Sequence, residues 1–169
     1  SRMSTQSHEL SSDELHDLLR RTAALCVRKE YCASEVMQKL RAKGATPEQA
    51  AQLLERLQHE GYTDDLRYAR AFVSDKFRFD HWGRLKIAAA LRAKALPSHL
   101  IDEALLDIDE ADYEAAIADF IQSRRRTLKA PDAHTLALKV ARAAVNRGYE
   151  PHRVFDPLPV ADDLPDTDD

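Results

Sequence analysis

Apolar residues recur along this chain at the three- and four-residue spacing of one helix face. The first stripe follows Ser12, a good helix-capping residue, and contains Leu15, Leu18, Leu19, Thr22, Leu25 and Cys26. Another follows Thr46-Pro47, where proline occupies its favoured first helical position, and contains Ala50, Leu53, Leu54 and Leu57. Two of only four glycines, Gly44 and Gly61, lie where stripes end, as is typical of residues that close helices. The pattern predicts an all-α protein.

The pattern also repeats. LRAKG at residues 40–44 recurs as LRAKA at residues 91–95, and SDEL at residues 12–15 is matched by TDDL at residues 63–66, both at an offset of 51. In the second copy, Thr63 is predicted to cap a helix and Gly83 to start the next one. A weaker third copy has its own stripe, and its Gly148 aligns with Ala95 at an offset of 53. A fixed period of this size indicates stacked helical modules.

We therefore predict three tandem three-helix repeats that form an elongated, curved modular array, at residues 11–61, 62–108 and, in degenerate form, 109–155. Each repeat is too small to bury a full core alone, so neighbours are expected to pack together. Residues 1–10 are expected to be a disordered N-terminus with a tag remnant, and residues 156–169 an acidic disordered tail.

Charge is segregated along the chain. The formal net charge is −4, but residues 156–169 hold six carboxylates and no Lys or Arg, which leaves the rest of the chain at +2. Residues 67–94 and 124–153 each carry eight basic and two acidic residues, whereas residues 98–119 carry eight acidic and none basic. Such alternation predicts separate positive and negative surface zones.

The basic blocks supply the candidate partner- or DNA-binding residues: Lys76, Arg78, Arg84, Lys86, Arg92, Lys94, Arg124, Arg125, Arg126, Lys139, Arg142 and Arg147. Around the first of these, aromatic residues alternate with cations, which is typical of base-stacking surfaces. The alternative is structural: Phe77 belongs to a core, and Phe79 and Trp82 close a corner between helices. Likewise, cations at helix C-termini, such as Arg92 and Lys94, also stabilise the helix dipole.

Catalytic chemistry is not indicated by the sequence. The histidines show no metal-ligand spacing, no glycine-rich phosphate loop is present, and Cys26 falls on an apolar face. We expect no enzyme activity, metal or cofactor. With no apolar run of about 18 residues and two cysteines outside any C-x-x-C spacing, we expect a cytoplasmic protein that contacts no membrane.

One stretch of the second repeat resembles the central signature of the RecX family, which are bacterial regulators of the recombinase RecA. The residues concerned are Gly61-Tyr62-Thr63-Asp64-Asp65, Tyr68-Ala69, Phe72-Val73, Gly83, Ile87, Leu91 and Ile101. The resemblance extends over about Asp13 to Phe155, and the family commonly has glycine at the position of Ala95.

The resemblance implies a non-enzymatic modulator that binds the RecA–single-stranded-DNA filament. We expect this chain to be a monomer, with at most weak direct DNA binding. It implies inhibition of the filament's ATPase, strand-exchange and coprotease activities, and thus regulation of recombinational repair and the SOS response. The alternative is a helix-turn-helix-like DNA-binding regulator, since three-helix units with a tight turn at Gly44 resemble such modules. Against it, residues 98–108 are acidic where a base-reading helix would lie.

Overall fold

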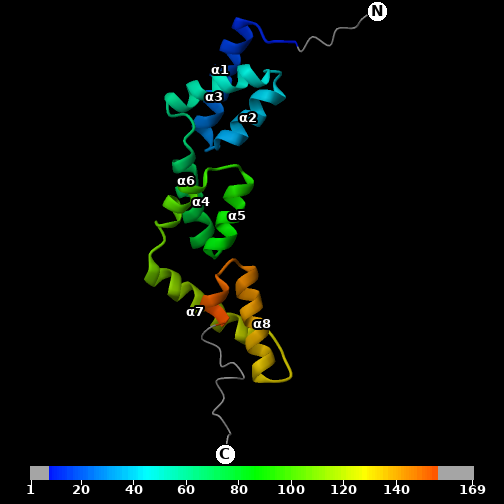
Figure 1. Ribbon diagram of the computed structural model, residues 1–169, viewed down its shortest axis with the longest axis vertical. Helices are drawn as coiled ribbons and strands as arrows, with labels where there is room; N and C mark the ends of the chain where they lie inside the picture. Colours follow the sequence, from blue (N-terminus) through cyan, green and yellow to red (C-terminus); the bar gives the residue numbers. More distant parts are fainter. Residues whose placement is uncertain (1–7, 156–169) are drawn as a thin grey trace, which may run out of the picture. The chain divides into compact units, whose positions relative to one another are not determined.

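Residues 8–155, which the computed structural model describes, form helices joined by turns and contain no strand (Figure 1). The helices are α1 (Ser12–Arg28), α2 (Ala33–Ala42), α3 (Pro47–His59), α4 (Asp65–Arg78), α5 (Arg84–Ala93), α6 (Ser98–Leu105), α7 (Glu110–Thr127), α8 (Ala133–Asn146) and α9 (Pro151–Phe155). The predicted all-α class is confirmed. The expected acidic tail, and residues 1–7 of the expected N-terminal segment, lie outside the described residues.

The described chain falls into two compact units. Unit 1 contains the chain up to Ala69 together with Leu91–Ile101, and unit 2 contains Arg70–Ala90 and the chain from Asp102 onward. The repeat boundaries after residues 61 and 108 stay a prediction.

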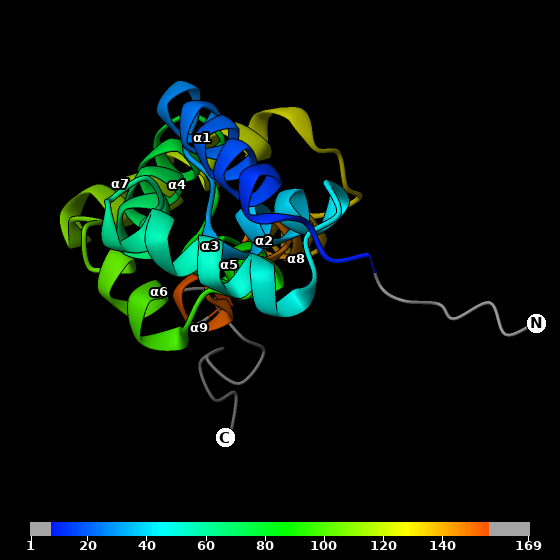
Figure 2. The same ribbon diagram turned by 90° about the horizontal axis from the view of Figure 1, so that it is seen from above.

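In unit 1, α1, α2 and α3 pack against one another around one apolar core, and they lie side by side in both views (Figure 1, Figure 2). The stripes predicted from the sequence provide the core, with Leu18, Cys26, Val36, Leu40, Ala45, Ala50, Leu53 and Leu57 buried. Ordered contacts begin earlier than expected, because Leu10 exchanges two backbone hydrogen bonds with the Gln49 side chain, at 3.2 and 2.8 Å.

Two predicted caps are each displaced by one residue. Ser11, not Ser12, caps α1: its hydroxyl accepts from the Glu14 backbone, and the Glu14 carboxylate accepts from the Ser11 backbone, which is a capping box. Asp64, not Thr63, caps α4 by accepting from the Arg67 backbone at 2.9 Å. The Thr63 hydroxyl is instead buried and directed at the backbone carbonyl of Tyr31, to which it donates at 2.6 Å.

Four helices end in the same way. A backbone N–H bonds to the carbonyl five residues earlier, in the pairs Ala45–Leu40, Tyr62–Leu57, Leu96–Leu91 and Tyr149–Ala144. The residue before each donor is left-handed, with φ of 101° at Gly44, 80° at Gly61, 62° at Ala95 and 105° at Gly148. This is the Schellman arrangement, in which glycine is favoured because it has no Cβ. Ala95 is the non-glycine member of this set.

In unit 2, α7 packs on α8 and α8 on α9. Four aromatic rings of this unit contact one another in a row. Their centroids are 5.9 Å apart for Phe77–Tyr113, 5.7 Å for Tyr113–Tyr149 and 5.8 Å for Tyr149–Phe120. The Tyr149 hydroxyl also donates to the His81 carbonyl at 2.8 Å.

The start of α5 meets the end of α8 backbone to backbone. Gly83 donates to the Arg147 carbonyl and Leu85 to the Gly148 carbonyl, both at 3.0 Å. A Cβ at Gly83 would collide with the backbone of Gly148, and one on Gly148 would collide with Lys86. Both glycines are therefore required by this close approach.

Candidate partner-binding surface

The twelve predicted cations are divided between the two units. Unit 1 holds Arg92 and Lys94, and unit 2 holds the other ten. Their surroundings separate those with internal partners from those that face solvent.

Lys94 is engaged inside unit 1. Its ammonium lies 3.2 Å from the Glu35 carboxylate, and its backbone carbonyl accepts from the Ser34 hydroxyl at 2.6 Å. Burial alone would raise the pKa of Glu35, but hydrogen bonds from the Cys32 backbone and the Lys94 ammonium outweigh it and lower the pKa. The bond to Glu35 raises the pKa of Lys94. Lys94 is thus a link within the unit, whereas Arg92 is exposed.

Arg84 is similarly engaged inside unit 2. Its guanidinium stacks on the Tyr113 ring, 3.9 Å from the centroid, and lies 3.0 Å from Glu110. Arg153 faces the same ring at 5.1 Å and lies 2.5 Å from Glu110. Burial, followed by the hydrogen bond to Glu150, raises the pKa of Tyr113. This network stabilises the unit and leaves Arg84 little capacity to bind a partner.

Trp82 is the centre of a small cationic cluster. The ammonium groups of Lys76 and Lys86 lie 4.9 and 4.5 Å from its ring centroid. Lys76 also pairs with Asp80 at 3.0 Å, and Trp82 meets Phe72 edge to face with centroids 6.4 Å apart. The predicted structural role of Trp82 is consistent with this packing.

Phe79 was predicted to close the same corner, and that prediction is wrong, because 74% of its surface is exposed. It follows the exposed Arg78 near the end of α4. Phe77, which the structural alternative assigned to a core, is half-buried and packs on Tyr113. The aromatic–cation segment therefore divides into half-buried rings and one exposed phenyl group.

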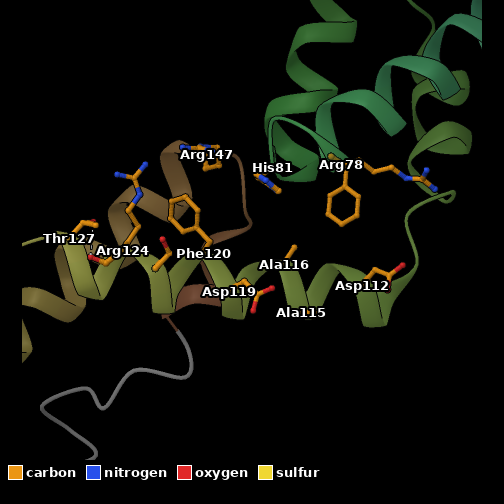
Figure 3. Close-up of a pocket in the computed structure, with 12 residues that line it drawn as sticks. Arg78, His81, Asp112, Ala115, Ala116, Asp119, Phe120, Arg124, Thr127 and Arg147 are labelled. Carbon is orange, nitrogen blue, oxygen red and sulfur yellow. Dashed lines mark hydrogen bonds between the residues drawn. The ribbon is translucent and has the colours of Figure 1, made fainter.

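A groove of about 650 Å³ lies in unit 2 (Figure 3). Its lining comes from α4, α7 and the turns after α4 and α8: Phe77, Arg78, His81, Asp112, Ala115, Ala116, Asp119, Phe120, Ser123, Arg124, Thr127 and Arg147. Arg124 and Arg147 gather around Phe120, with guanidinium carbons 5.1 and 5.2 Å from the ring centroid (Figure 3). Arg147 also donates to the Asp80 carbonyl at 3.1 Å. The groove thus joins predicted cations from separate basic blocks.

The other predicted cations of unit 2 lie on the surface. Arg125 and Arg126 are exposed at the end of α7, and Arg142 is exposed on α8. Lys139, also exposed, donates to the Lys129 carbonyl at 3.0 Å. The first three of these side chains are free to meet a partner.

A second groove, also of about 650 Å³, lies in unit 1 and was not predicted. Its cations are Arg21, Lys39 and Lys43. Arg21 pairs with Asp17 at 2.9 Å, and Lys39 lies 4.5 Å from the Tyr31 ring centroid. The signal for Lys43 was present in the 51-residue repeat, in which it is the counterpart of Lys94.

No helix among residues 8–155 has the length and apolar character needed to cross a membrane. Within the same residues, no three His, Cys, Asp or Glu side chains gather where they could hold a metal ion.

Known proteins resemble this chain in sequence. A family model described as the second three-helix domain of RecX matches residues 64–105. A protein named regulatory protein RecX from Xanthomonas axonopodis pv. citri is 33% identical over 132 residues, which are 78% of this chain and 80% of the relative. One of the same name from Chlorobaculum tepidum is 35% identical over 127 residues, 75% of this chain and 76% of the relative. A third, from Xanthomonas campestris pv. campestris (strain B100), is 34% identical over 106 residues, 63% of this chain and 64% of the relative, less than two thirds of its length.

Solved structures resemble it in fold. The crystal structure of RecX from Lactobacillus salivarius has a TM-score of 0.79 at 13% identity and covers 85% of this chain and 94% of the other. A crystal structure of regulatory protein RecX has a TM-score of 0.73 at 18% identity, and the match covers 86% of this chain and 76% of the other. The fold that they share with this chain is all-helical, and the family model describes its middle part as a three-helix domain. The chain belongs to the RecX family of regulatory proteins, as the sequence resemblance predicted.

Proposed function

We propose that this protein is a negative modulator of the RecA recombinase. It binds the RecA–single-stranded-DNA filament and inhibits the filament's ATPase, strand-exchange and coprotease activities. In this way it regulates recombinational repair and the SOS response. Membership of a family of regulatory proteins supports the proposal, and the resemblance to RecA regulators supplies the partner.

The observation that carries the proposal furthest is the set of exposed cations that have no partner among residues 8–155. Arg125, Arg126 and Arg142 in unit 2 and Arg92 in unit 1 face solvent. Cations placed in this way speed encounter with an acidic filament surface or with DNA phosphates, and they make binding depend on salt. Because they occur in both units, several weak contacts can act together at high effective concentration.

The proposed action is stoichiometric and needs no catalytic residue, cofactor or metal. The protein acts as a monomer, with only weak direct affinity for DNA. We place it in the cytoplasm, where the free thiols of Cys26 and Cys32 remain reduced.

The test is a titration of RecA ATPase on single-stranded DNA with this protein, alongside its binding to the same DNA without RecA. Loss of ATPase at or below equimolar protein, with weak DNA binding, is the expected result. Unchanged ATPase with tight DNA binding would overturn the proposal in favour of a DNA-binding regulator. A protein that neither changes the ATPase nor binds the DNA would have neither of these two functions.

A further inference from the structure

The groove of unit 2 contains arginines that form no ion pair within the described part of the chain. Elsewhere in the unit, Arg70 lies 3.3 Å from Glu103, and Arg84 and Arg153 share Glu110. The arginines that line the groove form no ion pair with any residue in the range 8–155: Arg78, Arg124 and Arg147. The lining also contains the carboxylates of Asp112 and Asp119, so the groove carries a net charge of +1 when His81 is counted as neutral.

The groove also offers apolar surface between these charges. Phe77 and Phe120 both contribute to its lining, and Arg124 and Arg147 already lie close to the ring of Phe120. A matching ligand would therefore present carboxylates to the guanidinium groups and aliphatic side chains to the rings.

The sequence that follows Phe155 has this chemistry. Residues 156–169 contain six aspartates and no Lys or Arg, and Leu158, Val160 and Leu164 are placed between the acidic positions. Three prolines restrict the backbone of this segment, which lowers the entropy lost when it binds.

This segment begins close to the helix that forms most of the groove. Arg153, two residues before the last described residue, contacts Glu110 and the Tyr113 ring in the first turn of α7. The groove follows α7 from Asp112 to Thr127, about 22 Å at 1.5 Å per residue. Fourteen residues extend to at most about 50 Å. The tether therefore reaches every lining residue and gives an effective concentration in the millimolar range.

We propose that Asp156–Asp169 binds in the groove of unit 2 as an intramolecular acidic ligand. Its aspartates pair with Arg78, Arg124 and Arg147, and its aliphatic residues pack on Phe120. Bound in this way, the segment withholds these arginines from any other anionic partner. The inference concerns the isolated chain and does not depend on the proposed action on RecA.

The test is paramagnetic relaxation in the full chain. A nitroxide is attached at Thr167→Cys, and amide signals are compared before and after its reduction. Cys26 and Cys32 are buried, and the chain without Thr167→Cys, treated identically, serves as the blank. We expect at least a twofold intensity loss for amides of residues 115–127.

Two changes should abolish this effect: Arg78→Glu with Arg124→Glu, or replacement of all six tail aspartates by asparagine. The matched control is Arg142→Glu, which reverses an exposed cation of the same unit outside the groove and should leave the effect intact. The aspartate replacement alters no described residue, so it keeps the test valid if the arginine variant folds poorly.

Full-intensity amides along α7, or a loss that survives both changes, would overturn the inference. A second result would also overturn it: a thymidine 15-mer shifts the amide signals of the groove equally in the full chain and in the chain without residues 156–169. That result would assign the groove to nucleic acid.

Discussion

Ala95 provides a quantitative test of how the helices of this protein end. It occupies the left-handed position after α5 with φ of 62°, where Gly44, Gly61 and Gly148 stand at the equivalent turns. An L-residue in this conformation costs about 1–2 kcal/mol. Glycine removes that strain but adds about 0.4–1 kcal/mol of freedom to the unfolded chain. Ala95→Gly should therefore stabilise unit 1 by about 0.5–1 kcal/mol.

The reciprocal change is Gly61→Ala. A Cβ at Gly61 would have no neighbour within 4 Å, so the substitution tests the backbone alone. We expect a loss of about 0.5–1 kcal/mol, of equal size and opposite sign to the gain at Ala95. With a urea m-value of about 1.5 kcal/mol/M, each change shifts the unfolding midpoint by about 0.3–0.7 M.

The assay is urea unfolding followed by helical circular dichroism, with amide signals of α1–α3 reporting on unit 1. An Ala95→Gly midpoint at or below that of the unaltered protein, while Gly61→Ala loses stability, would refute the strain at Ala95. If neither variant moves, the conformation at these turns does not limit stability.

Three further outcomes are expected. Gly83→Ala should destabilise unit 2 by about 3 kcal/mol or more in the same urea assay, because its Cβ meets backbone that cannot rotate away; a loss under 1 kcal/mol would contradict the close approach. The pKa of Glu35 is held below its ordinary value of 4.5, so the pair with Lys94 stabilises unit 1 above that pH and this contribution disappears as the pH falls through the folded-state pKa. The pKa of Lys94 is raised above its ordinary value of 10.5, so the pair also stabilises unit 1 below pH 10.5, and this contribution is lost as the pH rises through the folded-state pKa. In a plot of the urea midpoint against pH, Glu35→Gln should therefore reduce both the acidic and the alkaline decrease. If both decreases are unchanged, the linkage is excluded. Charge reversal of Arg124–Arg126 should weaken inhibition of RecA ATPase without changing helicity. Charge reversal of Arg28 and Lys29, an exposed pair at the end of α1, is the control and should leave inhibition unchanged. Equal inhibition by the unaltered protein and both variants would remove Arg124–Arg126 from the candidate partner-binding surface.

The helices were predictable because their signals are local. Apolar spacing, proline at the start of α3 and glycine at helix ends all act within a few residues. The displaced cap at Ser11 was readable too, since the Ser11-x-x-Glu14 spacing distinguishes it from Ser12. The displaced cap at Asp64 was not, because the Thr63 side chain is directed at the backbone carbonyl of Tyr31, 32 residues away, and that contact depends on the fold.

The candidate surface was only partly predictable for the same reason. A basic residue is visible in the sequence, but its partner is not: Arg84 meets Glu110 and Glu150, 26 and 66 positions further along. The grouping of Arg78, Arg124 and Arg147 in one groove likewise depends on tertiary contacts. Composition identified the cations, and the fold decided which of them remain free.

The backbone bonds between Gly83 and Arg147 and between Leu85 and Gly148 affect the order in which the chain folds during synthesis. Their partners lie 64 and 63 residues apart, which the ribosome covers in about 3–13 s at roughly 5–20 residues per second. The core of α1–α3 needs only residues 18–57 and can close well before then. Until Arg147 and Gly148 have been added, the backbone N–H groups of Gly83 and Leu85 lack the carbonyls that accept from them in the folded protein. A translational pause in this interval leaves these two N–H groups open to water.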